Sequence, residues 1–363
     1  MSRDGPRVAG VDPGTVSFDV CALDGGEVIL ERSFRTVDVG ADPSLLVRAL
    51  VDHGPFELVL GPAGYGLPLV PVERVGEREL ALMLLLREDE PHGRVGVGGM
   101  RSIVRALIAA DLPLVFGPGA IHLPTVPTYR KWNRIDLGTA DKVASVALCI
   151  ADQARRLGIG FAETSFVMLE LGGGFSAALA VDDGRIVDGL GGSAGPIGAR
   201  ACGALDAEVA YLLGAALSKR TVFSGGALDP QGELDLSQGL EALRSDPRHG
   251  DGWLALEEAA AKAALALTVS APAPREILAT GRMAQVPGVL EALGERLAGV
   301  GSVRLVAGLG AHAKAAAQGA AVLADGLSGG RYAALVERLG VAEASGCALD
   351  HLRVHGADRI RLR

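Results

Sequence analysis

The sequence predicts an α/β protein with two domains, in which helices and strands pack in three layers. The chain has 363 residues, enough for two domains of about 100–200 residues each. Residues 7–34 and 166–188 share one pattern: a strand, a glycine turn, a second strand, a turn of Asp and Gly, and a third strand. Because the two segments share little sequence identity, the prediction of a structural duplication depends on this pattern alone.

The first half is predicted to alternate between strands and helices. Short apolar runs that end in turn residues predict strands at 7–12, 17–23, 28–34, 57–60 and 112–116. Apolar residues at helical spacing predict helices at 42–52, 77–87 and 100–110. We expect Asp42 to cap the first of these helices, with Pro43 at its first position.

A long loop and a connecting helix are predicted between the two halves. The loop covers 117–138, and a loop of this length in a compact domain is more often functional than not. The helix covers 139–157 and has Thr139 as its cap. We therefore expect four parts of the chain: a first domain at 1–138, the interdomain helix at 139–158, a second domain at 159–310, and a returning helix with a C-terminal segment at 311–363.

The second half is predicted to continue the alternation. Its expected strands are 166–171, 175–181, 185–188, 221–223, 276–279 and 303–306. Its expected helices are 205–217, 253–269, 286–298 and 311–323.

Composition and charge exclude several classes of protein. Hydrophobic residues make up 49% of the chain, which excludes a disordered protein. The formal net charge of −8 argues against nucleic acid as a partner, because that would require a basic face. The four cysteines lie far apart, as expected of reduced thiols, and no secretory signal or membrane span is predicted. We expect a cytoplasmic protein that binds neither nucleic acid nor a membrane.

The sharpest chemical signal lies at the end of the first predicted strand, where Pro13, Gly14 and Thr15 follow Asp12. A glycine lets backbone N–H groups approach an anion, and successive N–H groups form a nest for phosphate. The Asp12 carboxylate can hold Mg²⁺ directly or through water. An ordinary turn is the alternative interpretation.

Three later segments suit the same chemistry. A strand that ends near Glu170 opens into the glycines 172–174, for which a tight hairpin is the alternative. Another strand opens at Gly281 into a helix, with Arg282 next, and such junctions are common. The last segment is the helix rich in Ala and Gly over 311–325, whose small residues also suit simple core packing.

These four segments, in this order, resemble the two phosphate segments, the adenosine segment and the connecting helix of one superfamily. That superfamily contains acetate and sugar kinases, heat-shock chaperones and actin. A narrower resemblance is to an archaeal family described as predicted butyrate kinases. It covers nearly the whole chain and is carried by the stretches VAGVDPGTVSFDVCAL, LGPAGYGLPL, HLPTVPTYRKWNRIDLGTADKVA, ALDAEVAYLLG and AAQGAAVLADGLSGGRY. The resemblance implies the actin-like ATPase fold, in which two ribonuclease-H-like domains clasp Mg-ATP in a cleft.

The resemblance also implies roles for individual residues. Asp12 and Glu170 would be the metal ligands, although the superfamily often has Asp at the second position. Arg282 would either stack on adenine or face solvent. The remaining nucleotide-binding residues implied are Gly14 and Thr15 in the first phosphate loop, Gly172, Gly173 and Gly174 in the second, and Gly281 in the adenosine loop.

The phosphoryl acceptor is the least determined part of the prediction. A hydroxyl acceptor usually needs a base, whereas a carboxylate is already ionised at pH 7 and needs a cationic clamp. Arg130, Lys131 and Arg134 in the long loop are the clamp candidates, with a solvated basic loop or a salt-bridged hinge as the alternatives. Asp141 is a candidate base or a helper to Mg²⁺, and Lys142 is a candidate to reach the γ-phosphate. The alternative for Asp141 is a first-turn acid that suits the helix dipole.

Two more features are candidates for the acceptor side of the site. The loop 61–66, which contains Tyr65, follows a strand end, where ligands bind in α/β folds. We expect it to hold the non-reacting end of the substrate. Among the histidines, His122 is the best candidate to lie near the transferred phosphate, although a structural role is favoured.

The function expected is that of a Mg-ATP-dependent kinase of a small carboxylate, butyrate-like, which forms an acyl phosphate and ADP. One alternative is a kinase of a hydroxyl-bearing metabolite with Asp141 as base. Another is a non-metabolic ATPase or a nucleotide-gated binding protein. ATP and Mg²⁺ are the expected cofactors, the acceptor is a small molecule, and a homodimer is left open.

Overall fold

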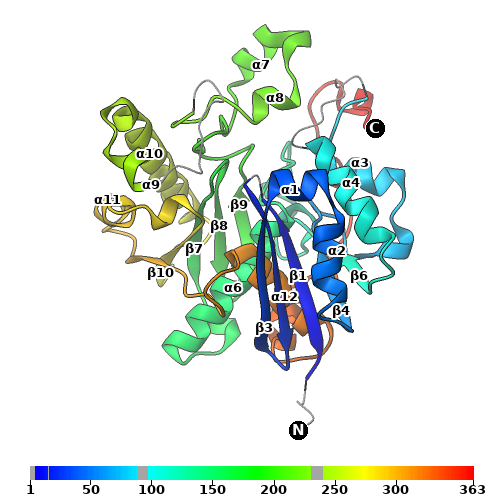
Figure 1. Cartoon of the computed structure of the whole chain (residues 1–363). Coiled ribbons are helices and arrows are strands. Elements are labelled where there is room, and N and C mark those ends of the chain that lie inside the picture. The colour runs from blue at the N-terminus through cyan, green and yellow to red at the C-terminus, as the bar shows by residue number, and fades with distance from the viewer. Residues whose placement is uncertain (1–4, 15, 89–96, 230–239) are drawn as a thin grey trace.

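The computed structural model of the chain describes residues 5–14, 16–88, 97–229 and 240–363. Thr15, assigned above to the first phosphate loop, lies outside the described residues. The described part folds into two β-sheets with helices between them and on both outer sides (Figure 1). Within it, no helix is both long and apolar enough to cross a membrane.

Both sheets have the same strand order. The first contains β1 (Arg7–Pro13), β2 (Ser17–Asp24), β3 (Glu27–Arg35), β4 (Leu58–Gly61), β5 (Val70–Pro71) and β6 (Leu114–Phe116), in the order β3-β2-β1-β4-β6-β5. The second contains β7 (Phe166–Leu171), β8 (Ser176–Asp182), β9 (Arg185–Leu190), β10 (Glu276–Thr280) and β11 (Val303–Leu305), in the order β11-β10-β7-β8-β9. In each, three antiparallel strands are followed by two parallel ones, and the first sheet has β5 as an additional edge strand that runs antiparallel to β6. The predicted duplication is therefore confirmed in the topology.

Two buried helices form the layer between the sheets. The helix α6 (Ala140–Leu157) lies against β7 and β8, and α12 (Ala315–Leu327) lies against β1, β2 and β4. Every residue from 142 to 154 of α6 is buried, as is every residue from 316 to 326 of α12. The predicted role of the small residues in α12 is confirmed, because a side chain at Gly319 would collide with the backbone of Ala144 in α6.

Shorter helices cover the outer faces of the sheets (Figure 1). The first sheet packs on α2 (Ser44–Val51), α3 (Glu77–Leu84) and α4 (Val97–Ile108), and the second on α10 (Gly250–Leu267) and α11 (Val289–Arg296). The other helices are α1 (Thr36–Ala41), α5 (Thr128–Lys131), α7 (Ala207–Leu213), α8 (Lys219–Val222), α9 (Leu240–Ser245) and α13 (Ala333–Leu339).

The structure corrects two predicted elements. The strand expected at 221–223 is wrong: Ser218 and Thr221 form a capping box that starts the short helix α8 instead. The final helix begins at Ala315 rather than at 311, because the preceding backbone N–H groups bond to side chains and not to the helix.

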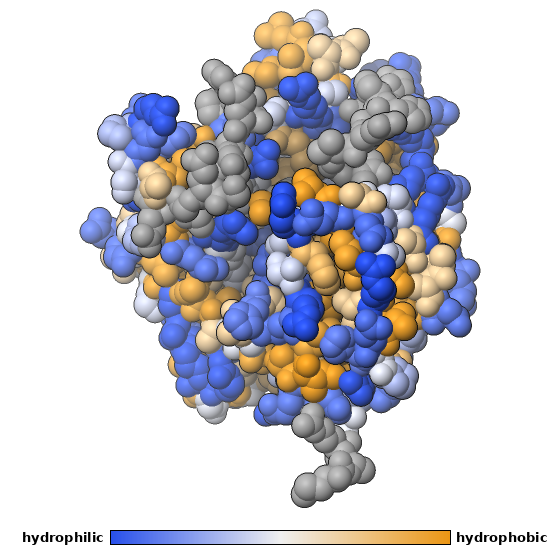
Figure 2. Space-filling view, in the orientation of Figure 1, coloured by the Kyte–Doolittle hydropathy of each residue, from blue (hydrophilic) through white to orange (hydrophobic). Residues whose placement is uncertain are grey.

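An apolar helix surface stands out at the top of the molecule. Figure 2 shows apolar side chains over α7, where Tyr211 is 80% and Leu212 is 79% exposed. An exposed apolar patch of this kind is typical of an interaction surface. The homodimer that the sequence leaves open stays a prediction.

Candidate active site

Two clusters of charged side chains meet where β1 and β7 end, and each combines carboxylates with one lysine. In the first cluster, the Lys314 ammonium at the start of α12 lies 2.7 Å from Asp12 Oδ2 and 2.9 Å from Asp19 Oδ2. It also donates to the backbone oxygen of Ser17 at 2.7 Å. Asp12 comes from β1 and Asp19 from β2, and both carboxylates are buried.

The second cluster repeats this arrangement on the other sheet. The Lys142 ammonium in the first turn of α6 lies 2.6 Å from Glu170 Oε1 on β7 and 2.5 Å from Asp141 Oδ2. Ser145 Oγ donates to the second oxygen of Glu170 at 3.1 Å, and Thr139 Oγ1 donates to Asp141. Four residues singled out from the sequence, namely Asp12, Asp141, Lys142 and Glu170, therefore lie in these two clusters.

Burial and charge perturb these groups in different directions. Burial raises the pKa of Asp12 against the opposing charge of Lys314, and the nearby charge of Asp141 raises it further. Burial likewise raises the pKa of Glu170 against the charge of Lys142. For Asp141, burial alone would raise the pKa, but the ammonium of Lys142 and the hydrogen bonds to it outweigh burial and lower it. Because the charge of Asp141 acts on Asp12 and the charge of Lys314 acts on Asp141, the two clusters form one site.

A glycine turn follows each strand-end carboxylate with the same geometry. Gly14 N donates to Ser17 O at 3.0 Å, and Gly172 N donates to Phe175 O at 2.9 Å. A side chain at Gly14 would lie 2.7 Å from Ser17 O, and one at Gly172 would lie 2.8 Å from Phe175 O. Both positions are therefore closed to larger residues.

The third predicted loop adjoins the second turn. Gly281, directly after β10, has a φ of +89°, and a side chain there would collide with the backbone of Leu171. Thr280 pairs in register with Glu170, is 1% exposed, and its hydroxyl has no hydrogen-bond partner. Since an unpaired buried hydroxyl costs about 1–3 kcal/mol, it marks a position where a ligand or water would be stabilised. Arg282, the next residue, is half-buried.

These residues fit a magnesium–nucleotide. Among the described residues, no group of three or more His, Cys, Asp or Glu side chains is arranged to hold a metal ion. Magnesium at a phosphate site needs only one or two protein carboxylates, because water and phosphate oxygens supply its other ligands. The strand-end carboxylate of Asp12 meets that requirement. The close glycine turns and the unpaired Thr280 hydroxyl suit the nucleotide.

The predicted acceptor clamp makes its contacts elsewhere. Arg130 Nη1 donates to Val187 O at 2.8 Å, and its guanidinium lies 3.7 Å from Asp188 on β9. Lys131 is buried and donates to Leu123 O at 2.8 Å. In the described part of the chain these bonds hold the long loop to itself and to β9, not to either charged cluster. A role of Arg130 and Lys131 toward the acceptor stays a prediction.

Two other sequence candidates lie close to the start of α6. Gly64 O accepts a hydrogen bond from Ala140 N at 3.1 Å, so the loop with Tyr65 lies beside Asp141. His122 is buried, and its Nδ1 accepts a hydrogen bond from the backbone N–H of Gly119 at 3.2 Å. Burial lowers the pKa of His122 to about 4, so the imidazole is neutral at pH 7.

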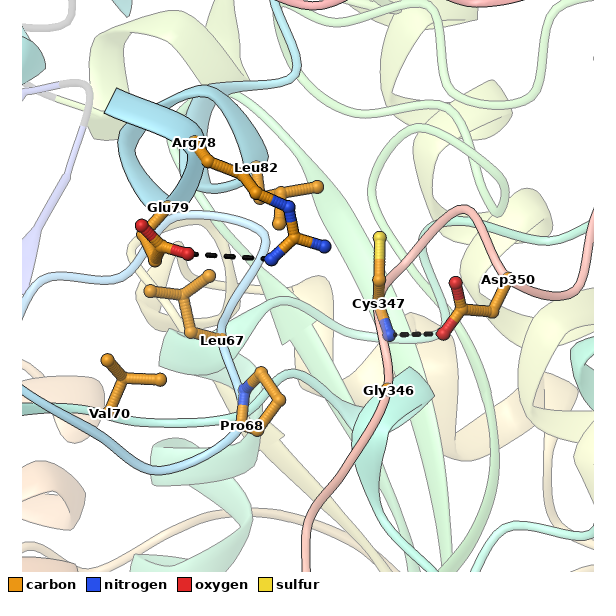
Figure 3. A pocket seen from close by; sticks show the side chains of 9 residues that line it. All are labelled: Leu67, Pro68, Val70, Arg78, Glu79, Leu82, Gly346, Cys347 and Asp350. Carbon is orange, nitrogen blue, oxygen red and sulfur yellow. Dashed lines mark hydrogen bonds and ion pairs between the residues drawn. The ribbon is translucent and has the colours of Figure 1, made fainter. Parts of the chain in front are cut away.

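A separate pocket of about 290 Å³ lies between α3 and the C-terminal segment. Figure 3 shows Arg78 and Glu79 on one side of it and Cys347 and Asp350 on the other. None of its lining residues belongs to the two charged clusters. This pocket is therefore not part of the candidate active site.

Sequence reasoning missed Lys314, Asp19 and Ser145. Lys314 had one usable signal: it is one of only five lysines in the chain and directly precedes the small-residue helix α12. Its counterpart Lys142 also stands at the start of a helix that follows one half of the chain. Comparing the two helix starts would have revealed the pair.

One family model matches most of the chain. The family model described as "Protein of unknown function (DUF1464)" matches residues 10–354. No curated protein matches the chain.

Solved structures of two-domain kinases resemble the chain at low identity. The propionate kinase from Francisella tularensis aligns at a TM-score of 0.57 and 13% identity, over 86% of this chain and 98% of its own. The acetate kinase from Entamoeba histolytica aligns at 0.55 and 14%, over 80% and 86%. The Porphyromonas gingivalis acetate kinase aligns at 0.53 and 14%, over 81% and 88%. The predicted two-domain actin-like ATPase fold is confirmed, and the narrower resemblance to predicted butyrate kinases stays a prediction.

Proposed function

We propose that this chain, which belongs to the DUF1464 family of proteins of unknown function, is an ATP-dependent phosphotransferase that phosphorylates a small carboxylate. The observation that carries the proposal is the pair of strand-end carboxylates, Asp12 and Glu170, each followed by a tight glycine turn and each paired with a lysine. Phosphoryl transfer depends mostly on positioning and on neutralising charge, and this arrangement supplies both.

The nucleotide would lie across the two glycine turns. Asp12 would hold Mg²⁺, with Glu170 as the second carboxylate near it, and the metal would neutralise phosphate charge. Backbone N–H groups of the glycine turn at 172–174 would face the phosphates. Gly281 would lie beside the nucleoside, and the Thr280 hydroxyl would gain a partner.

The state of Asp141 favours a carboxylate acceptor over a hydroxyl acceptor. Its carboxylate accepts hydrogen bonds from Thr139 and Lys142, and its pKa is lowered, so it is a weak base at neutral pH. A carboxylate needs no base, because it is already ionised at pH 7. The aligned acetate and propionate kinases are named for substrates of this class, which supports the same choice for this chain.

In the proposed reaction a carboxylate oxygen of the acceptor attacks the γ-phosphorus of ATP. The bond from that phosphorus to the bridging oxygen of the β-phosphate breaks, and the electron pair leaves with ADP. The products are an acyl phosphate and ADP, and no proton is transferred. The loop with Tyr65, beside Asp141, would hold the acceptor's tail.

The test follows both products together. The protein is incubated with Mg-ATP, hydroxylamine and straight-chain acids from acetate to hexanoate, and ADP and hydroxamate are measured. Asp12→Asn should abolish both products. Asp52→Asn, an exposed carboxylate at the end of α2, is the matched control and should change neither.

The outcomes separate the alternatives. Hydroxamate that forms with one acid and is lost in Asp12→Asn supports the proposal and names the acceptor. ADP that rises only with hydroxyl compounds, without hydroxamate, would point to a hydroxyl kinase with Asp141 as base. Tight ATP binding with slow turnover and no acceptor dependence would indicate an ATPase or a nucleotide-gated protein instead.

A further inference from the structure

The lysine at the start of α12 has no role in the arrangement proposed above. We propose that Lys314 is a catalytic residue of the phosphoryl transfer: its ammonium exchanges Asp12 for an oxygen of the transferred phosphoryl group when the nucleotide binds. This inference rests on the proposed phosphotransferase function. It assigns Lys314 a contact with the phosphoryl group that the fold alone does not imply.

The first support is the position of the ammonium within the first phosphate turn. A side chain at Gly14 would collide with Lys314 Nζ, so the ammonium lies directly beside Gly14 at the end of β1. Its three acceptors are Asp12 Oδ2, Asp19 Oδ2 and Ser17 O, all within 2.9 Å. An ammonium has three N–H donors, so these contacts occupy all of them. A phosphate oxygen must therefore replace one acceptor.

The second support is the charge of this cluster. Asp12 is 5% and Asp19 is 1% exposed, whereas the Lys314 side chain is 39% exposed. Two buried carboxylates share one ammonium and so retain one negative charge, which attracts a divalent cation and repels a bare phosphate. A metal bound at Asp12 would compensate that carboxylate and release the ammonium toward the phosphates. Asp19, deeper in the sheet, would remain its anchor.

The third support is the rigid attachment of the segment that carries Lys314. The Glu31 carboxylate on β3 accepts backbone hydrogen bonds from three successive residues, 311–313, at 2.8–3.2 Å. Gln318 Oε1 accepts from Leu309 N and Gly310 N. Five consecutive N–H groups are thus fixed by two side chains, and the next residue is Lys314. Glu31 is therefore a positioning residue for the lysine.

The composition of the chain makes a direct measurement practical. Only five lysines occur, at 131, 142, 219, 262 and 314. With lysine labelled by ¹⁵N in the side chain, each ammonium signal is assigned by a single Lys→Arg variant. Titration of wild-type protein with Mg²⁺ and a non-hydrolysable ATP analogue should shift the Lys314 signal and leave that of Lys262 unchanged. Lys262 lies on α10, is 73% exposed and is the matched control.

The kinetic test uses variants of the same residues. Lys314→Met should lower kcat for ADP formation by about 100-fold or more, as for loss of one preorganised charge contact, and should also raise KM for ATP, because the contact forms when the nucleotide binds. Lys314→Arg should restore part of kcat, and Lys262→Met should have no effect. Without nucleotide, Lys314→Met should bind Mg²⁺ about 10-fold more tightly, because the carboxylates lose their internal cation.

The positioning role of Glu31 has its own readout. Glu31→Gln should shift the Lys314 signal in the absence of nucleotide and lower kcat. Glu27→Gln, an exposed substitution on the same strand, should do neither.

Failure of this inference can be told apart from failure of the proposed function. If the nucleotide analogue binds but the Lys314 signal does not move, Lys314 has only a structural role, and the proposed function stands. The same conclusion follows if Lys314→Met retains kcat. If no nucleotide binds at millimolar concentration, both fail together. Should Lys314→Met not fold, the wild-type titration decides the question.

Discussion

His122 allows a quantitative test of how the loop before α6 is built. The imidazole is buried beside Gly119, and burial lowers its pKa from 6.5 to about 4. As pH falls below 6.5, the unfolded chain binds a proton at this residue, but the folded chain does not until about pH 4. The folded state therefore loses stability with falling pH across this window, and the contribution is fully present above pH 6.5.

The size of this effect follows from the same two values. Each pH unit between them costs about 1.4 kcal/mol, so the whole window amounts to about 3 kcal/mol, and about 2 kcal/mol is lost by pH 5. The assay is urea unfolding at several pH values from 8 to 4.5 for the wild type and for His122→Asn. Between pH 6.5 and 4.5 the free energy of unfolding of His122→Asn should fall less steeply with pH than that of the wild type, by about 1.4 kcal/mol per pH unit. The other histidines are present in both proteins and cancel in this comparison.

Equal pH slopes for the two proteins would refute the reasoning, because His122 would then titrate as an exposed histidine does. The result also bears on catalysis. An imidazole that is neutral at pH 7 cannot neutralise a transferred phosphoryl group. We therefore expect His122→Asn to keep kcat at pH 7.5 within a few fold.

Three further substitutions test the packing and the site. Gly319→Ala places a methyl group against the backbone of Ala144 and should lower the free energy of unfolding in urea by about 3 kcal/mol. Arg130→Ala should lower stability by about 1 kcal/mol through loss of its contact with Asp188, and ADP formation should persist if the residue only anchors the loop. Glu170→Gln should lower ADP formation about 10-fold or more with little change in the thermal midpoint.

Much of the fold is predictable because its strands are specified locally. The strand β7 begins and ends where predicted, since an apolar run between turn residues has few alternative structures. The error at α8 has a different cause. Thr221 and Val222 favour a strand by propensity, but the cap formed with Ser218 starts a helical turn. The start of α12 was misjudged because Glu31, distant in sequence, takes up the preceding N–H groups.

Some residues of the candidate site are likewise predictable from the sequence, and others are not. Asp12 and Glu170 were predictable, because a carboxylate at a strand end before a glycine turn is visible in a short window of sequence. The contact between Lys314 and Asp12 was not, because the two residues are 302 positions apart and their contact depends on how α12 crosses the first sheet. For Arg130 the residue is visible in the sequence but its contacts are not. Sequence reveals a basic loop, but only the fold shows that this guanidinium faces β9.

The exchange of helices between the two halves explains why the site needs both. The helix α6 follows the first sheet in sequence but covers the second, and α12 follows the second sheet but covers the first. Consequently Asp12 receives its lysine from α12, and Glu170 receives its lysine from α6. Each pair belongs to one sheet and its covering helix, so a relative movement of the sheets would keep both pairs and change only their separation.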